Sequence, residues 1–268
     1  MVIGGKTFDT DNSCYIMGIL NVTPDSFSDG GKWASIDNAL RHAGDMIRDG
    51  ADIIDVGGES TRPDYLSISA QEEIERTIPV IEALRRGFDV PISIDTCKSD
   101  VADAAIRAGA DMVNDIWGLK RDPAMADVIA RSGKACCLVH NRVGAEYSDF
   151  LQSMLGDLGE SAALAVKAGI AADKVILDPG IGFAKTYAMN LVAINRLDLI
   201  KKLGYPVLLG VSRKSVIGLT LGLPVTERVE GSLAAAVIGA MRGCSFVRVH
   251  DVKETKRALL MAEAILRA

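Results

Sequence analysis

Short apolar runs alternate along the chain with longer segments that carry an apolar stripe. The runs are continuous, which is typical of strands buried on both faces of a parallel sheet. They lie at residues 15–20, 53–56, 92–94, 112–114, 135–139, 175–177, 207–211 and 246–249. Between them, apolar residues recur three or four positions apart, the spacing of one face of an α-helix. Such stripes are Ile36/Leu40/Ala43/Ile47, Ile74/Ile78/Ile81, Val229/Leu233/Ala236/Ala240 and Leu259/Ala262/Leu266.

Glycines at the ends of the helical segments support this alternation, because glycine adopts the left-handed conformation that ends many helices. They are Gly50, Gly87, Gly109, Gly133, Gly169, Gly204 and Gly243. Eight strand–helix units therefore follow one another, and no linker divides them. The pattern predicts a single α/β domain over residues 1–268, a (β/α)₈ TIM barrel. An open doubly wound sheet is the alternative. Residues 1–14 stand outside the repeat and predict a short N-terminal hairpin or arm that closes the barrel floor.

Composition narrows the classes of protein. The chain has 268 residues, 49% of them hydrophobic and 24% charged, which suits a large core and excludes extensive disorder. A formal net charge of −5 disfavours nucleic-acid binding through a basic surface. Residues 1–6 have no signal-peptide core, and the apolar run 233–241 is far shorter than the ~20 residues of a membrane span. Five cysteines without a CxxC pair favour the reducing cytoplasm.

Polar side chains stand at or after the ends of the predicted strands. A barrel gathers these ends around one mouth, where barrel enzymes keep their active sites. Any one of the residues could simply mark the start of a loop, but the combination of carboxylates, amides and cations favours a single site. The set is Asn21, Asp55, Asp95, Asn114, Asp115, His140, Asp178, Ser212, Arg213, Lys214, Arg248 and His250.

The loop over residues 21–31 is long and offers the hard oxygen atoms of Asn21, Asp25 and Asp29. Few protein oxygens, with room for water and phosphate oxygens, suit Mg²⁺. Phe27 adds an apolar face. A mobile lid is the functional interpretation, and a rigid surface loop is the alternative.

Three further segments predict anion binding. Residues 57–63 combine two glycines with Thr61 and Arg62, although Arg62 could instead be an exposed surface charge. Residues 210–215 place hydroxyls and cations where a helix is predicted to begin, which favours an anion, and they do not form a Walker A motif. Alternation along the last strand puts Arg248 and His250 on the same side.

Asp95, Asp178 and Asn114 remain as polar groups at predicted buried strand ends. A buried carboxylate must find hydrogen-bond donors or lose its charge. A flat heterocycle with a ring N–H and an amino group offers such donors and would be selected by them. Internal salt bridges with lysine or arginine are the other interpretation, and strand-end position alone does not exclude them.

Taken together, these segments resemble the dihydropteroate synthases, in the family's order and over nearly the whole chain. The matching pieces are MGILNVTPDSFSDGG at 17–31, DVGGESTRP at 55–63, SIDT at 93–96, VNDIWG at 113–118, DPGIGFAKT at 178–186, GVSRKSVIG at 210–218, GSLAA at 231–235 and VRVHDV at 247–252. The resemblance implies condensation of p-aminobenzoate with 6-hydroxymethyl-7,8-dihydropterin diphosphate, which releases diphosphate and 7,8-dihydropteroate. It also implies a homodimer and a p-aminobenzoate site for which sulfonamides compete.

The resemblance further implies roles for individual residues. Asn21 would bind Mg²⁺, and Thr61 would contact the diphosphate. Lys214, Arg248 and Asp29 would form the catalytic group, although either Asp29 or Asp95 could stabilise a cation on the methylene carbon. The implied pterin pocket contains Asp95, Asn114, Asp178 and Lys214. The implied diphosphate site contains Arg248, Val249 and His250. The implied p-aminobenzoate site contains Phe27, Arg62, Pro63 and Ser215.

The chain departs from the common family pattern at a few positions. Asp64 and Ala184 stand where glycine is common, and residues 140–142 read His-Asn-Arg rather than His-Met. Two other functions remain open. A pterin-binding methyltransferase would share the aspartates and the asparagine but would not need the 21–31 loop or the Arg248/His250 pair. A degenerate paralogue would bind a pterin or a partner without turnover, and the presence of Asn21 and Lys214 disfavours it.

Overall fold

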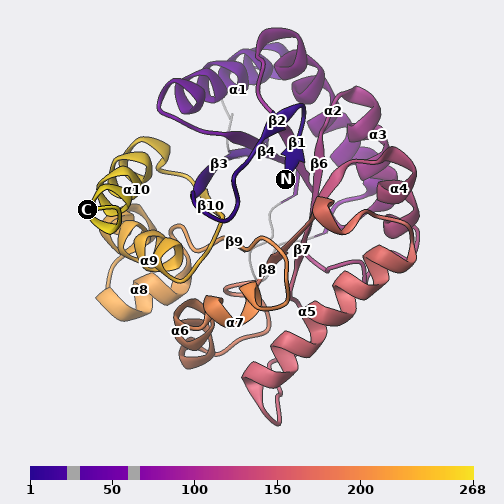
Figure 1. The fold of residues 1–268 in the computed structure, drawn as a ribbon. Helices are drawn as coiled ribbons and strands as arrows, with labels where there is room; N and C mark the ends of the chain where they lie inside the picture. Colours follow the sequence, from indigo (N-terminus) through magenta and orange to yellow (C-terminus); the bar gives the residue numbers. More distant parts are fainter. Residues whose placement is uncertain (23–30, 60–66) are drawn as a thin grey trace.

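The continuous apolar runs form one parallel sheet that closes into a barrel (Figure 1). The computed structural model describes residues 1–22, 31–59 and 67–268, and gives the backbone alone for residues 31–35. Within that part of the chain the eight parallel strands lie in the order β8-β7-β6-β5-β4-β3-β10-β9. A parallel bridge between Leu177 and Val207 joins the two edges. The strands are β3 (Tyr15–Asn21), β4 (Ile53–Gly57), β5 (Ile92–Asp95), β6 (Met112–Asp115), β7 (Ala135–Val139), β8 (Val175–Asp178), β9 (Leu208–Leu209) and β10 (Phe246–Val249).

The amphipathic segments form helices around the outside of the barrel (Figure 1). The TIM-barrel prediction is therefore confirmed. The helices are α1 (Gly31–Arg48), α2 (Ala70–Gly87), α3 (Ser99–Ala108), α4 (Met125–Ser132), α5 (Phe150–Lys167), α6 (Tyr187–Asn195), α7 (Leu197–Lys201), α8 (Ser215–Leu221), α9 (Val229–Met241) and α10 (Val252–Leu266). Short 3₁₀ turns lie at Ala172–Lys174 and Val225–Glu227.

Local chemistry explains several helix boundaries. The Ser69 hydroxyl accepts the Glu72 N–H at 3.1 Å and begins α2, and Asp149 accepts the Gln152 N–H at 3.0 Å and begins α5. Gly109 ends α3 with a φ of 116°, a conformation that other residues adopt only with strain.

Three details of the sequence prediction were wrong. Gly87 is the last residue of α2 and is not left-handed, because the helix ends instead at an extended Phe88. Leu266 lies on the outer face of α10 and is 61% exposed. The seventh strand is Leu208–Leu209 rather than residues 207–211, because Val207 makes only the isolated bridge and the chain leaves the sheet after Leu209 and turns at Ser212 and Arg213 before α8.

Two apolar clusters lie on either side of the sheet. The larger cluster fills the space between barrel and helices and includes Ile16, Ile54 and Leu177. The smaller cluster includes Met17, Ile53 and Phe246. Because neighbouring residues of one strand belong to different clusters, the strands are buried on both faces, which is why their apolar runs are continuous.

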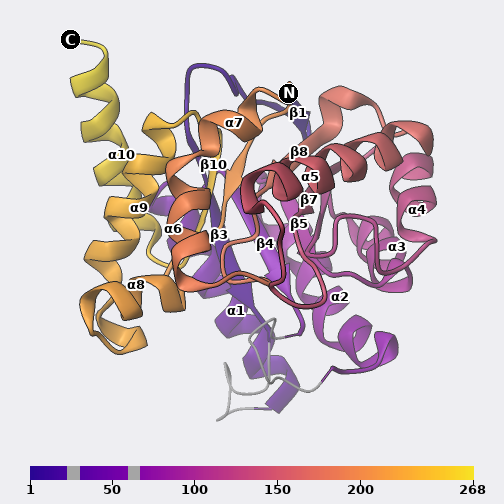
Figure 2. The ribbon, with the colours of Figure 1, turned by 90° about the horizontal axis from the view of Figure 1, so that it is seen from below.

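The predicted N-terminal hairpin is present and covers one end of the barrel (Figure 2). β1 (Val2–Ile3) pairs with β2 (Lys6–Thr7), and the fully buried Ile3 and Phe8 join the smaller apolar cluster. The Phe8 ring packs edge-on against Tyr15, with centroids 4.9 Å apart. The hairpin therefore closes the floor of the barrel at the amino-terminal ends of the strands.

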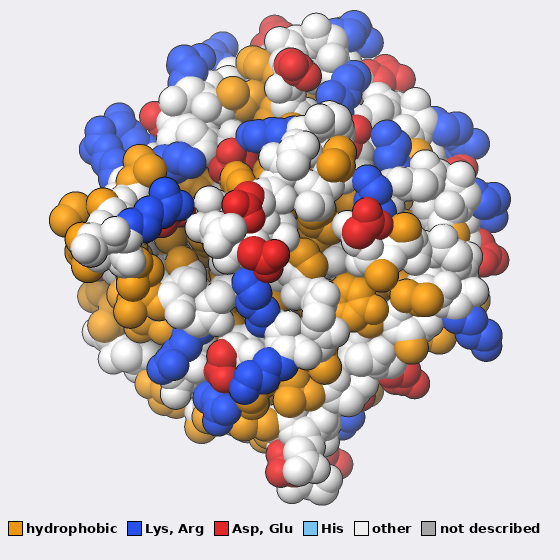
Figure 3. All heavy atoms as spheres, in the orientation of Figure 1, with side chains coloured by type: hydrophobic (Ala, Val, Ile, Leu, Met, Phe, Trp, Pro, Cys, Tyr) orange, Lys and Arg blue, Asp and Glu red, His pale blue; other side chains and the backbone are white. Residues whose placement is uncertain are grey.

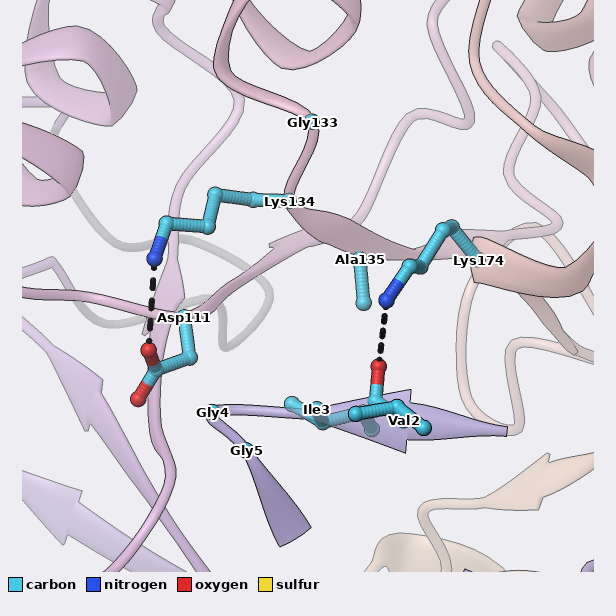
Figure 4. A pocket seen from close by; sticks show the side chains of 9 residues that line it. All are labelled: Val2, Ile3, Gly4, Gly5, Asp111, Gly133, Lys134, Ala135 and Lys174. Atoms are coloured by element: carbon cyan, nitrogen blue, oxygen red, sulfur yellow. Dashed lines mark hydrogen bonds and ion pairs between the residues drawn. The ribbon is translucent and has the colours of Figure 1, made fainter. Parts of the chain in front are cut away.

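A cavity of about 240 Å³ lies between the hairpin and the turns beneath the barrel (Figure 4). Lys174 Nζ donates to the Val2 carbonyl at 2.7 Å, and Lys134 Nζ lies 3.4 Å from Asp111 Oδ1. Lys174 thus helps to fix the hairpin against the floor, at the opposite end of the strands from the polar residues discussed below.

Replacement of Phe8 tests the role of the hairpin. Phe8→Ala removes a side chain that is 1% exposed, so we expect the free energy of unfolding to fall by about 3–5 kcal/mol. Urea unfolding followed by circular dichroism measures this change. Val2→Ala, at a position 42% exposed, is the control and should change stability by no more than ~0.5 kcal/mol. Equal stability of the two variants would show that the hairpin does not seal the core.

Candidate active site

Arg248 connects the carboxyl ends of strands on both sides of β3. Its Nε atom donates to Asp55 Oδ2 at 2.6 Å, and its Nη2 atom donates to Asp95 Oδ2 at 2.7 Å. Asn114 donates to the same Asp55 oxygen at 3.4 Å. Side chains from β10, β4, β5 and β6 therefore form one polar network inside the barrel.

Burial sets the electrostatics of this network. The side chain of Asp55 is 0% exposed, that of Asp95 7%, and that of Arg248 17%. Burial raises the pKa of Asp95 to about 7, the Arg248 charge opposes this rise, and the Asp55 charge adds to it. Burial also disfavours the charged form of Arg248, but Asp55 and Asp95 outweigh it and raise the pKa of Arg248. Removal of Arg248 would leave two buried carboxylates without this counter-ion, at a typical cost of about 3–5 kcal/mol.

Four buried oxygen atoms of this region have no hydrogen-bond partner within the described ranges. They are Asp55 Oδ1, Ser93 Oγ, Asp95 Oδ1 and Asn114 Oδ1. A buried acceptor left without a donor costs about 1–3 kcal/mol. The network is therefore suited to a ligand that supplies several N–H donors in a small space.

Asp178 and Lys214 lie beside Arg248. A Cβ atom added at Gly210 would lie 3.5 Å from Asp178 Oδ2, 3.8 Å from Lys214 Nζ and 3.9 Å from Arg248 Cβ. All three side chains therefore lie around the same backbone position. The barrel brings together Asp95, Asp178, Lys214 and Arg248, as the sequence predicted.

The loop after β8 holds both Asp178 and Lys214. Asp178 Oδ1 accepts the Gly180 N–H at 2.6 Å. Lys214 Nζ donates to the Ile181 carbonyl at 2.5 Å and lies 4.9 Å from the centroid of the Phe183 ring. Burial raises the pKa of Asp178, an effect that Lys214 opposes. Burial lowers the pKa of Lys214 to about 8, against the attraction of Asp178.

The two cations of the loop between β9 and α8, Arg213 and Lys214, have different partners. Arg213 forms two hydrogen bonds with Asp251, so its charge is already paired. The Ser212 hydroxyl lies 3.1 Å from His250 Nδ1 and accepts the His250 backbone N–H at 3.2 Å. Lys214 occupies the N-cap position of α8 without a side-chain capping hydrogen bond. Ser215 is the first residue of the helix, and its side chain is exposed.

Two other predicted site residues have informative positions. Asn21 is the exposed last residue of β3, and its Oδ1 atom would lie 3.4 Å from a Cβ added at Gly57. The same added Cβ would lie 3.9 Å from Asp95 Oδ2, so Asn21 is close to the buried network. Val249 is 2% exposed and packs in the apolar cluster under the helices. Its backbone, rather than its side chain, is left for a substrate.

The predictions for five site residues lie outside the described residues. These residues are Phe27, Asp29, Thr61, Arg62 and Pro63. The Mg²⁺ ligand role considered for Asp25 and the family departure at Asp64 also fall there.

Sequence analysis placed Asp55 among the polar residues of the barrel mouth but gave it no specific role, and the structure places it between Arg248 and Asn114. The available signal was a carboxylate inside an apolar run, where a charge needs a buried partner. His140 was placed at the mouth in the same way, and neither it nor Lys185 was given a specific role. They form a contact of 2.7 Å between the loops after β7 and β8, which pattern analysis of either loop alone does not predict.

Comparison with known proteins agrees with this geometry. Residues 17–250 match the family model described as pterin binding enzyme. A dihydropteroate synthase from Clostridium beijerinckii is 56% identical over 100% of both chains, and one from Bacillus subtilis is 55% identical over 94% of this chain and 88% of its own length.

Solved structures agree as well. A dihydropteroate synthase from Clostridium difficile, crystallised in the presence of pteroic acid, superposes with a TM-score of 0.95 at 48% identity and covers 98% of this chain and 100% of its own. A Yersinia pestis dihydropteroate synthase in complex with a sulfonamide drug gives a TM-score of 0.94 at 42% identity, over 100% and 99% of the two chains. The chain therefore belongs to the pterin-binding enzymes and, among them, to the dihydropteroate synthases.

Proposed function

We propose that this chain condenses p-aminobenzoate with 6-hydroxymethyl-7,8-dihydropterin diphosphate and releases 7,8-dihydropteroate and diphosphate. The observation that carries the proposal is the buried network of Asp55, Asp95, Asn114 and Arg248, with its unpaired acceptor oxygens. Solved relatives contain p-aminobenzoate in one case and 7,8-dihydropteroate in another. The same substrate and product fit the chemistry of the described side chains.

A dihydropterin ring would complete the hydrogen bonding of the buried oxygens. Its 2-amino group and ring N–H are donors, and Asp95, Asn114 and Asp178 offer acceptors at three different strand ends. A ligand without these donors would leave the buried acceptors unpaired, which disfavours it strongly. Lys214, with its aliphatic stem and its charge beside Asp178, would close one side of this pocket.

The diphosphate would lie towards the cations and donors of the last strands. A guanidinium carries five N–H donors, and Arg248 uses two of them on Asp55 and Asp95. The remaining three are sufficient to bind phosphate oxygens while the ion pairs persist. His250 and Lys214 would add donors for the same anion, and Thr61 would contact it from the second loop.

Mg²⁺ is the proposed metal, with Asn21 as a protein ligand. No group of three His, Cys, Asp or Glu side chains suited to a metal occurs among the residues that the structure describes. A site with one amide oxygen fits Mg²⁺ only if waters and phosphate oxygens complete the shell, as is common for this ion. The exposed position of Asn21 next to Gly57 and Asp95 is compatible with such a shell. When bound, Mg²⁺ would neutralise charge on the departing diphosphate.

The proposed mechanism is electrostatic. Arg248, Lys214 and His250 stabilise negative charge as the bond between the methylene carbon and the diphosphate oxygen breaks. The electron-rich dihydropterin shares the positive charge left on the carbon, and Asp29 or Asp95 stabilises it. The neutral amino group of p-aminobenzoate, held by Phe27, Arg62, Pro63 and Ser215, then attacks that carbon and loses a proton.

No cysteine is needed as a nucleophile in this mechanism. All five cysteines are free and buried. Burial raises the pKa of Cys97 to about 11 and raises that of Cys137 well above its usual value. Buried thiols of this kind are poor nucleophiles.

A homodimer in the cytoplasm is proposed as the working form. Hydrophobic side chains gather over α9 and α10 at the left of Figure 3, and α6 and α8 pack beside α9. Exposed apolar residues of these helices include Leu191, Leu219, Ile238, Met241, Leu260, Met261 and Ile265. A large apolar patch favours association with a second copy of the chain. Within the described ranges, no helix is long and apolar enough to span a membrane.

Light scattering of the purified protein measures its association directly. A chain of 28.5 kDa should elute with about twice that mass, because a dimer would cover the apolar face of α9 and α10. Met261→Glu places a charge at a side chain 62% exposed on that face and should shift the equilibrium towards the monomer. Lys253→Glu, at an exposed position of the same helix, is the control. A wild-type monomer at micromolar concentration would contradict the dimer.

Diphosphate release tests the reaction itself. Purified protein supplied with dihydropterin diphosphate, Mg²⁺ and p-aminobenzoate should release diphosphate only when p-aminobenzoate is present. Lys214→Ala should lower kcat/KM by about 100-fold or more, because it removes a buried cation beside the pterin pocket. Circular dichroism should show that this variant is folded.

Other outcomes of this assay identify the competing functions. Binding of the dihydropterin diphosphate without release would support a degenerate paralogue. Methyl transfer from methyltetrahydrofolate to a corrinoid protein would support the methyltransferase. Wild-type turnover by Lys214→Ala would remove Lys214 from the site.

The pH dependence of kcat/KM tests the charges in the pocket. Asp95 must be ionised to accept N–H donors from the pterin, and its raised pKa of about 7 means that activity falls as pH drops below that value. Lys214 must be protonated, and its lowered pKa of about 8 means that activity falls above that value. We therefore expect a bell-shaped profile. Lys214→Arg should move the alkaline limb upward, and a flat profile from about pH 6 to 9 would contradict these assignments.

A further inference from the structure

The loops after β7 and β8 approach each other unusually closely. A Cβ atom at Gly180 would lie 1.9 Å from the His140 carbonyl oxygen, so no side chain fits there, and the φ of 67° also favours glycine. Two side-chain contacts reach across the same gap. Lys185 Nζ lies 2.7 Å from His140 Nδ1, and the Tyr147 hydroxyl donates to the Ala184 carbonyl at 2.9 Å.

The Lys185 side chain bonds back to the backbone of its own loop, the loop after β8. Its Nζ atom donates to the Gly180 carbonyl and to the Phe183 carbonyl, both at 3.0 Å. Burial lowers the pKa of Lys185 to about 7, an effect that Asp178 opposes, so the ammonium form predominates below that value. In that form these two carbonyls and His140 Nδ1 provide three acceptors for its three N–H bonds. Ile181 lies between the two carbonyls, so Lys185 fixes the conformation of the turn that carries it.

The partners of His140 determine which of its ring nitrogens carries the proton. Its Nε2 atom lies 2.9 Å from Asp157 Oδ2, and Arg142 holds that carboxylate with hydrogen bonds of 2.5 and 3.0 Å. Asp157 is an acceptor, so Nε2 carries the hydrogen. Burial and the Lys185 charge lower the pKa of His140 to about 4, which keeps the ring neutral and leaves Nδ1 as an acceptor for Lys185.

This assembly borders the proposed pterin pocket without belonging to it. The turn that Lys185 fixes presents the Ile181 carbonyl, which accepts from Lys214 Nζ at 2.5 Å, and the Phe183 ring, 4.9 Å from the same atom. Lys214 is thus held on two sides by residues whose positions depend on Lys185.

We infer that Lys185 is a positioning residue for Lys214, and that it is supported by His140 and Tyr147 of the loop after β7 and by Asp157 of α5. We call these four residues the loop clamp. The inference rests on the proposed function, in which Lys214 lines the pterin pocket. It extends that function to a group that need not touch either substrate.

A comparison of KM values for the two substrates tests this role. Lys185→Met keeps an unbranched side chain that is one atom shorter and removes the hydrogen bonds. We expect KM for dihydropterin diphosphate to rise about tenfold, because Lys214 loses the support of the turn that Lys185 fixes, while KM for p-aminobenzoate stays within about twofold. Calorimetry of the dihydropterin diphosphate alone should show the same loss of affinity. Lys167→Met, at an exposed position of α5, is the matched control.

Tyr147→Phe keeps the inference testable if Lys185→Met does not fold. It removes one hydroxyl and retains the ring, so KM for the pterin substrate should rise about threefold, as expected for one neutral hydrogen bond. Tyr205→Phe, at a half-buried position of the apolar core, is the control. Equal KM values for the pterin substrate in the two tyrosine variants would overturn the inference. A folded Lys185→Met protein whose KM values for the two substrates are both unchanged, or are raised by the same factor, would also overturn it.

Nitrogen-15 NMR of the imidazole rings provides a test that needs no substrate. The chain has three histidines, so the signals can be assigned by substitution. His140 should be neutral at pH 7 with its proton on Nε2, and a proton on Nδ1 would overturn the inference. Wild-type protein without p-aminobenzoate-dependent turnover would overturn the proposed function itself. If Lys185→Met turns over normally and has the wild-type KM for the pterin substrate, only the inference about the loop clamp is overturned.

Discussion

The geometry of the barrel mouth depends on one buried cation. Two carboxylates from neighbouring strands repel each other in a medium of low polarity, and Arg248 makes their joint ionisation tolerable. The guanidinium is planar and its donors have a fixed geometry, so its two hydrogen bonds also fix the separation of Asp55 from Asp95. A lysine could balance the charge but would not hold both oxygens in defined directions. The buried acceptors around it then remain in place for a ligand.

The regular parts of this molecule could be read from the sequence, because burial on both sheet faces leaves a continuous apolar run and helices leave a periodic one. Strand-end polar residues were identified for the same reason, since every parallel strand ends at the same mouth. β9 was overestimated because Val211 is apolar and buried although it lies beyond the strand. Periodicity does not distinguish a buried strand residue from a buried turn residue.

Other features required coordinates. Asp55 was placed at the barrel mouth from its position near a strand end, but its pairing with Arg248, 193 positions away in sequence, follows only from the closed barrel. The contact between His140 and Lys185 spans 45 positions and arises only because β7 and β8 are neighbours in the sheet. Ala184 adopts a φ of 45°, which a sequence comparison marks only as a missing glycine. The hydrogen bond from Tyr147 to its carbonyl helps to hold a conformation that costs alanine about 1–2 kcal/mol.

The N-terminal hairpin has a kinetic implication. Among the described residues, Ile3 and Phe8 fill the amino-terminal end of the barrel interior, behind the buried carboxylates. A bicyclic ring seated against Asp95 and Asn114 would therefore enter and leave through the mouth at the carboxyl ends of the strands. A second reactant that binds above the ring blocks this route until the two molecules are joined. Such a closed channel favours an ordered reaction, in which the ring that binds deeper enters first and the joined product leaves last.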